Sequence, residues 1–244
     1  MLNITEKLIS KNRPFRKLVS LKAIIIHWTA NTNKGANALA NAKYFNSDQY
    51  LIKKDKTKVK ISASAHYVVD DKNIIQCIPD NEVGYHVGSK SGYKELVYTK
   101  IGIPRSDSPN NYTIGIEMCV NSDSDFVKTR QNTIELTIDL LKKHNLTASN
   151  VFRHYDITGK DCPKMMIDGN AWYEFLLEIE NYNVNAIKLR VNTNELNVRA
   201  GSGTNYPIKR KLKQDDIVTK LEQSGQWYRI GDDEWIHASY VIMG

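Results

Sequence analysis

The sequence predicts two folds in one chain, an α/β domain followed by a small all-β barrel. In the first 180 residues, short β-branched runs alternate with segments whose apolar residues recur at helical spacing. After residue 186 the helical spacing ends, and short alternating segments follow, separated by turn residues roughly every 8 to 12 positions. We therefore predict a domain over residues 1–180, a polar linker over 181–186 and a barrel over 187–244.

Each element of the α/β domain has its own sequence signal. The run KAIIIHW at 22–28 predicts a buried strand, and the Ala-rich segment at 36–46 predicts a helix. Two apolar runs within 63–79, joined by a polar turn, predict a hairpin. Residues 88–111, rich in Gly, Ser, Pro and Asn, predict a long loop. The remaining elements are a strand, a helix, a strand and a helix at residues 112–120, 129–145, 150–157 and 169–182.

Composition and charge narrow the function classes. The chain is 41% hydrophobic and 25% charged, which is enough apolar content for a packed core. The formal net charge of +7 favours anionic partners, but the basic residues are spread out, so we expect no nucleic-acid partner. Three cysteines do not form a disulfide framework, and Cys77 and Cys119 lie in apolar runs where small buried residues are expected.

No apolar run approaches the roughly 18 residues of a membrane span, so stable membrane insertion is not expected. The N-terminal segment has neither the apolar core nor the small-residue cleavage site of a signal peptide. We therefore expect synthesis in the cytoplasm of the host cell and action elsewhere only after release. The sequence does not indicate an oligomeric state.

The segment FRHYDITGKDCPKMM at 152–166 carries the strongest chemical signal. His154 and Cys162 stand eight positions apart, and a neutral imidazole and a thiolate are both good zinc ligands. Thr158 and Gly159 between them allow the chain to fold back. His27, in a predicted buried strand, is the candidate third ligand, with a core histidine bonded to a backbone carbonyl as the alternative. His66 and His86 are competing candidates for the role of third ligand.

Five segments in order resemble the zinc-dependent N-acetylmuramoyl-L-alanine amidases of the type-2 amidase family, which includes phage endolysins, bacterial autolysins and peptidoglycan recognition proteins. They are IIIHWTA, SAHYVVD, VGYHVG, YTIGIEMCV and FRHYDITGKDCP, within about residues 20–180. The resemblance implies a mixed central sheet flanked by helices. It also implies that His27, His154 and Cys162 hold Zn²⁺, with a water in the fourth position.

Amide hydrolysis further needs a base and a group that stabilises the oxyanion. Glu117 is the candidate base, because strand alternation puts it opposite the apolar face of its strand and a lone buried carboxylate is unfavourable. The alternative is an edge-strand glutamate in solvent. Lys160, two residues before Cys162, is the candidate oxyanion partner, and the alternative is a solvated loop lysine.

Other side chains are assigned to the cleft or left open. His66, His86, Trp28 and Thr29 are expected to line the substrate cleft. Asp156 could orient a ligand or cap the following turn. Some relatives place a catalytic tyrosine immediately before the strand histidine. This chain has alanine at that position, so the tyrosine role is not transferred.

Residues 187–244 resemble bacterial SH3 domains (SH3b), which serve as wall-targeting modules. Asn197, Arg199, Gly201 and Pro207 carry the resemblance. Together the two resemblances imply an endolysin that cuts the bond between N-acetylmuramic acid and L-alanine in Gram-positive peptidoglycan, after holin-dependent release. The alternatives are a non-catalytic peptidoglycan-binding protein and a cytoplasmic zinc amidase that acts on muropeptides.

Overall fold

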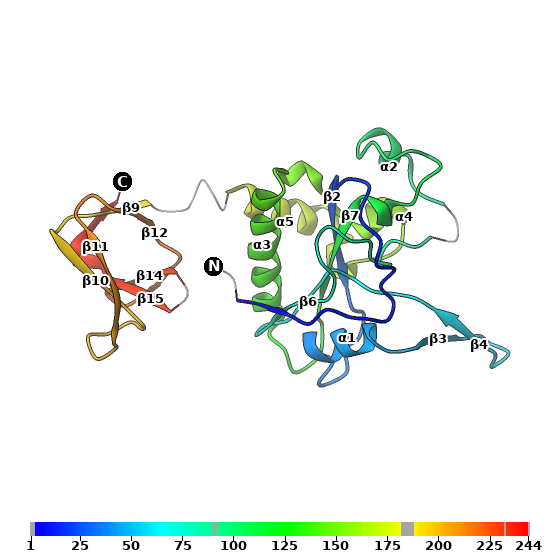
Figure 1. The fold of residues 1–244 in the computed structure, drawn as a ribbon, viewed down its shortest axis with the longest axis horizontal. Coiled ribbons are helices and arrows are strands. Elements are labelled where there is room, and N and C mark those ends of the chain that lie inside the picture. Colours follow the sequence, from blue (N-terminus) through cyan, green and yellow to red (C-terminus); the bar gives the residue numbers. More distant parts are fainter. Residues whose placement is uncertain (1–2, 90–91, 182–187, 232, 244) are drawn as a thin grey trace. The chain divides into compact units, whose positions relative to one another are not determined.

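The computed structural model describes residues 3–89, 92–181, 188–231 and 233–243 (Figure 1). The chain divides into two compact units, one formed by Ile4–Ile179 and the other containing Glu180–Gly244. Of the predicted linker at 181–186, all but residue 181 lies outside the described residues. Among the described helices, none combines the length and the apolar character that a membrane crossing requires.

The first unit is built on a six-stranded mixed sheet with the order β1-β6-β5-β7-β2-β8. Its strands are β1 (Ile4–Glu6), β2 (Ala23–Trp28), β5 (Tyr67–Val69), β6 (Ile74–Gln76), β7 (Thr113–Met118) and β8 (Val151–Arg153). Only the β5–β6 pair is antiparallel, and the other four pairings are parallel. The mixed central sheet implied by the resemblance is therefore confirmed.

Within the described residues of this unit, five α-helices accompany the sheet: α1 (Ala38–Phe45), α2 (Glu95–Thr99), α3 (Phe126–Lys143), α4 (His154–Thr158) and α5 (Gly169–Asn181). The three longer ones, α1, α3 and α5, were predicted. The two short ones were missed, because five residues are too few to show a helical period. Helix α2 interrupts the predicted loop at 88–111. Helix α4 replaces the second half of the predicted strand at 150–157.

The two faces of the sheet are covered by different helices (Figure 1). Helix α3 packs against β5 and β7 on one face. On the other face, Ala23 and Ile25 of β2 join a core cluster with Val97 of α2 and Ile157 of α4. Since alternate residues of a strand share a face, His27 points to the same side as Ala23 and Ile25.

A two-stranded hairpin of β3 (Gln49–Ile52) and β4 (Lys58–Ile61) stands apart from the central sheet and projects from the unit (Figure 1). No strand was predicted from the sequence over residues 49–61. Most of its side chains are exposed, so burial gave it no strong apolar pattern.

The second unit is all-β, as predicted. Its strands form a five-stranded antiparallel sheet, β11-β10-β15-β14-β13, and a three-stranded one, β12-β9-β16. They are β9 (Lys188–Val191), β10 (Glu195–Arg199), β11 (Ile208–Lys213), β12 (Ile217–Thr219), β13 (Glu222–Ser224), β14 (Trp227–Gly231), β15 (Glu234–His237) and β16 (Val241–Met243). Six buried aliphatic side chains form its core: Leu189, Val191, Leu196, Val198, Leu212 and Ile236.

Candidate functional site

The candidate site lies at the carboxyl ends of three adjacent parallel strands, β7, β2 and β8. His27 is the penultimate residue of β2, Glu117 is the penultimate residue of β7, and His154 directly follows β8. His27 and Glu117 are register partners, so their side chains leave the sheet on the same face. This edge of a parallel sheet is where α/β folds commonly place their ligands.

The loop after α4 brings Cys162 back to the same place. Gly159 ends α4 in a left-handed conformation (φ +82°), which glycine adopts without strain. The Tyr155 N–H then donates to the Cys162 carbonyl at 2.9 Å. This bond closes the loop against the first turn of α4, next to His154. The reversal expected at Thr158 and Gly159 is therefore present.

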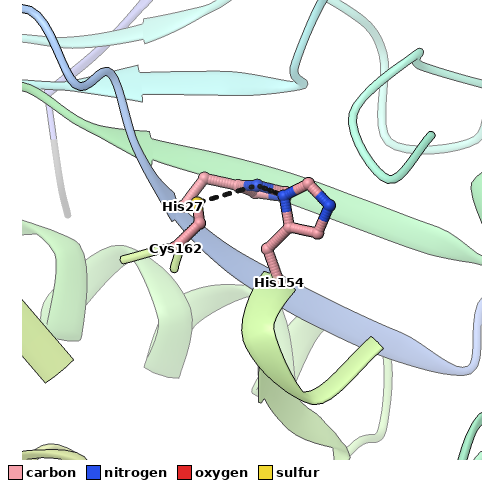
Figure 2. Close-up of side chains that lie close together, drawn as sticks. All are labelled: His27, His154 and Cys162. Carbon is pink, nitrogen blue, oxygen red and sulfur yellow. Dashed lines mark hydrogen bonds between the residues drawn. The ribbon is translucent and has the colours of Figure 1, made fainter. Parts of the chain in front are cut away.

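His27, His154 and Cys162 converge in a buried cluster, and their side chains point toward one another in Figure 2. The His27 Nδ1 atom lies 3.1 Å from the His154 Nδ1 atom and 3.7 Å from the Cys162 Sγ atom. One ligand atom from each residue lies within 4.8 Å of the other two. The three predicted metal ligands are thus brought together, whereas His66 and His86 are not part of this trio.

The spacing of these atoms suits a zinc ion. Tetrahedral zinc with Zn–N of about 2.05 Å and Zn–S of about 2.3 Å separates two nitrogen ligands by about 3.3 Å and nitrogen from sulfur by about 3.5 Å. The separations of 3.1 and 3.7 Å around His27 Nδ1 differ from these values by about 0.2 Å. Two imidazoles and one thiolate also leave a fourth position open, as catalytic zinc sites do.

The electrostatics keep the two imidazoles in the metal-binding form. Burial, followed by the neighbouring His154, His86, Lys160 and His66 charges, holds the pKa of His27 well below its usual range. Burial and the Lys160 ammonium lower the pKa of His154 to about 4. Both rings are therefore neutral at pH 7. Burial raises the pKa of the Cys162 thiol to about 12, so it loses its proton on binding a metal rather than before.

Glu117 and Lys160 lie beside this cluster. The Glu117 Oε2 atom is buried and has no hydrogen-bond partner among the described residues. Burial raises the pKa of Glu117 to about 8, and the Lys160 charge opposes that rise. Strand β7 lies between β5 and β2, so the alternative of an edge-strand glutamate does not apply. Lys160 is exposed, yet its charge acts on Glu117, His27, His154 and Cys162 together.

His66 and His86 were expected to line the substrate cleft, but both are buried and both use their ring nitrogens inside the protein. His66 Nδ1 accepts from the Gly115 N–H at 3.1 Å, and its Nε2 lies 2.8 Å from the Glu82 carbonyl. His86 Nδ1 lies 3.1 Å from His27 Nε2, and its Nε2 lies 3.2 Å from the Thr113 carbonyl. Neither ring keeps a free polar atom for a substrate.

Trp28 and Thr29, also expected in the cleft, are half-buried. The Trp28 backbone N–H hydrogen-bonds the Cys162 sulfur, which ties β2 to the loop after α4. Thr29 Oγ1 is buried without a partner among the described residues. Thr29 lines a pocket of about 300 Å³ against α1, together with Asn31, Ala36, Ala40, Asn41 and Tyr44. No sequence signal selected the α1 residues of this pocket, because they fit an ordinary helix.

Asp156 caps α4 and does not contact the cluster. Its carboxylate accepts from the Arg153 backbone N–H at 2.9 Å and pairs with the Arg153 guanidinium at 2.8 Å. Capping was one of the two roles left open for Asp156, but the cap lies at the start of α4 and not on the following turn. The two remaining cysteines, Cys77 and Cys119, are free and buried, as expected.

Comparison with known proteins agrees with this fold. Residues 17–165 match the family described as N-acetylmuramoyl-L-alanine amidase, and residues 194–242 match the bacterial SH3 domain. The chain belongs to the N-acetylmuramoyl-L-alanine amidase family and carries a bacterial SH3 domain in its second unit.

Relatives of this chain include amidases of Bacillus species. The chain is 35% identical over 254 residues to the N-acetylmuramoyl-L-alanine amidase XlyA of Bacillus subtilis (strain 168), covering all of this chain and 68% of XlyA. It is 36% identical over 175 residues to the amidase CwlL of Bacillus licheniformis, covering 70% of this chain but only 44% of CwlL. The solved catalytic domain of XlyA superimposes with a TM-score of 0.57 at 33% identity, over 73% of this chain and 99% of that domain.

Proposed function

We propose that this chain is a peptidoglycan hydrolase that cleaves the amide bond between N-acetylmuramic acid and L-alanine. The observation that carries the proposal is the convergence of His27, His154 and Cys162 at zinc spacing beside the buried, unpartnered carboxylate of Glu117. Membership of the amidase family supports the choice of bond.

His27 and His154 would hold Zn²⁺ through their Nδ1 atoms, and Cys162 would hold it through its thiolate. A bound Zn²⁺ would polarise a water molecule and the substrate carbonyl, and it would favour the ionised form of Glu117. Glu117 would accept the proton of that water and pass it to the departing amine of L-alanine. Lys160, whose charge reaches all of these groups, would stabilise the negative charge that develops on the carbonyl oxygen.

The pocket between β2 and α1 is a suitable seat for the part of the substrate next to the cut bond. Thr29, which lines it, is two residues from His27 along the chain. Asn31, Asn41 and the unpartnered Thr29 hydroxyl offer both donors and acceptors. An N-acetyl sugar or a peptide stem presents the matching amide groups.

The second unit would hold the enzyme on its insoluble substrate. A pocket of about 390 Å³ on this unit is lined by Trp227, His237 and Tyr240 together with polar side chains of β10. Aromatic and polar groups in one pocket suit sugars and peptides. Binding of the wall there would raise the local substrate concentration for the first unit. We place the action at the Gram-positive cell wall, reached after release through a membrane lesion.

The test is digestion of purified Gram-positive walls by the zinc-loaded chain. We expect new N-terminal alanine without new reducing sugars, and loss of the activity on chelation with recovery on addition of Zn²⁺. New reducing ends instead would point to a glycosidase and refute the assignment. Wall binding without new ends would support the non-catalytic alternative. Cleavage of soluble muropeptides but not of walls would support the muropeptide amidase.

A further inference from the structure

His27 is the innermost of the three candidate ligands, and its second ring nitrogen continues into a hydrogen-bonded series. The Nε2 atom of His27 lies 3.1 Å from His86 Nδ1. The Nε2 atom of His86 in turn lies 3.2 Å from the Thr113 carbonyl and 3.1 Å from the Thr113 hydroxyl. That hydroxyl donates its own proton to the Pro109 carbonyl at 2.8 Å.

The last members of the series fix where each proton lies. A carbonyl oxygen can only accept, and the Thr113 hydroxyl has already donated its proton, so it too accepts from His86. The proton of the His86 ring is therefore on Nε2. Burial disfavours the charged ring, so His86 is neutral and carries a single N–H, which leaves its Nδ1 atom as an acceptor.

It follows that His27 donates from Nε2 to His86, and its Nδ1 atom keeps a free lone pair. That lone pair is directed at the space shared with His154 Nδ1 and Cys162 Sγ. We propose that His86, backed by Thr113, is a positioning residue that holds His27 in the one tautomer able to bind the metal through Nδ1. The inference rests on the proposed zinc site and adds to it a residue outside the ligand set.

The packing around His86 supports this role, because the ring has little freedom to turn. Its edge contacts the His27 and His66 rings in T-shaped arrangements, with centroids 5.2 and 5.6 Å apart. Across the ring lies Gly115 of β7, where an added Cβ atom would stand 2.6 Å from His86 Cγ and Nδ1. Glycine in the middle of this buried strand thus provides the space that His86 occupies.

The backbone of His86 is fixed as well. The side-chain oxygen of Asn110 accepts from the N–H groups of His86 and Val87 at 3.1 and 3.0 Å. Asn110 and Pro109 belong to one 3-10 turn, Pro109–Asn111, that leads directly into Thr113 at the start of β7. One short segment therefore holds both the backbone and the ring of His86.

The first test uses the wild-type chain without metal. Nitrogen-15 NMR of the histidine rings should show His27 in the form protonated at Nε2, with a bare Nδ1. A dominant Nδ1–H form of His27 would overturn the inference. Since no metal is involved, this result is independent of whether the chain proves to be a zinc amidase.

The second test compares zinc affinities by chelator competition. His86→Leu removes the acceptor and should weaken zinc binding about 10- to 100-fold. His86→Asn keeps an oxygen near the position of Nδ1 and should retain more affinity than His86→Leu. His144→Leu is the control: it removes a histidine ring that hydrogen-bonds Asp80 and neither His27 nor His86, and should change zinc affinity less than about 3-fold. Equal affinities in wild type and His86→Leu would refute the positioning role.

If His86→Leu does not fold, His86→Asn and the metal-free spectrum still decide the question. If the wild type binds no zinc while His27 is protonated at Nε2, the proposed function fails and the tautomer assignment stands.

Discussion

Replacing Glu117 with glutamine should separate catalysis from stability. Glu117 Oε2 is buried without a partner, and burial raises the pKa of this carboxyl from 4.5 to about 8. In the metal-free protein at pH 7 the folded chain therefore keeps the proton, whereas the unfolded chain has lost it. At pH 7, about 2.5 units above the unfolded pKa of 4.5, this proton uptake lowers the free energy of unfolding by about 3.5 kcal/mol, at about 1.4 kcal/mol per unit.

The sign of the pH dependence follows from the raised pKa. Unfolding releases a proton between pH 4.5 and about 8, so raising the pH through this window lowers the stability of the wild type. The amide of Glu117→Gln does not titrate. The stability of this variant relative to wild type should thus increase from pH 5 to pH 7 by up to about 3 kcal/mol.

The assay is urea unfolding of both proteins, freed of metal, at pH 5, 6 and 7. Other titrating groups are common to the two chains, so the difference in unfolding free energy isolates Glu117. In the zinc-loaded form the same variant should lose at least about 100-fold in turnover while keeping its zinc, because Glu117 is not among the three ligands. A pH-independent stability difference would refute the burial argument, and near-normal turnover would refute the role as base.

Three further outcomes are expected. Lys160→Ala should lower turnover about 100-fold or more with zinc retained. Lys164, also exposed, begins the 3-10 helix that follows the same loop, and Lys164→Ala should leave turnover unchanged; equal effects would exclude a specific role for Lys160. Cys162→Ala should abolish stoichiometric zinc in metal analysis, and retention of tight zinc would remove Cys162 from the site. The buried carboxylate of Asp80 hydrogen-bonds Tyr67, Lys143 and His144. Asp80→Asn should therefore lower the unfolding free energy by about 2 kcal/mol at pH 7 in urea, and an unchanged value would show that these bonds do not stabilise the fold.

The pH dependence of the Asp80 effect is opposite to that of Glu117. Burial raises the pKa of Asp80, but hydrogen bonds from Lys143, Tyr67 and His144 outweigh it, and the net pKa lies below its usual value. The stabilisation is therefore full above about pH 4 and is lost as the pH falls through the folded pKa. The gap between wild type and Asp80→Asn should close in acid.

Much of the fold could be read from local patterns. The β-branched run of β2, the apolar alternation of β7 and the helical spacing of apolar residues in α3 are local sequence patterns. Each can be recognised without knowing which segments pack against it. The exposed hairpin of β3 and β4 and the five-residue helices lacked such a signal. The barrel was predicted because its strands alternate and its turns are frequent.

The sequence by itself determined that His154 and Cys162 could meet, because Gly159 allows the segment between them to reverse direction. Spacing alone left His66 and His86 as competitors of His27 for the third ligand, because all three lie in short apolar segments, and the resemblance to the amidase family favoured His27. The tertiary structure decided this through the order of its sheet, which sets β2 between β7 and β8 and brings His27 to His154 across 127 positions of sequence. The tertiary structure also places His86, which was expected to line the substrate cleft, next to His27. Hydrogen bonds between rings depend on contacts between distant segments, and no local period encodes them.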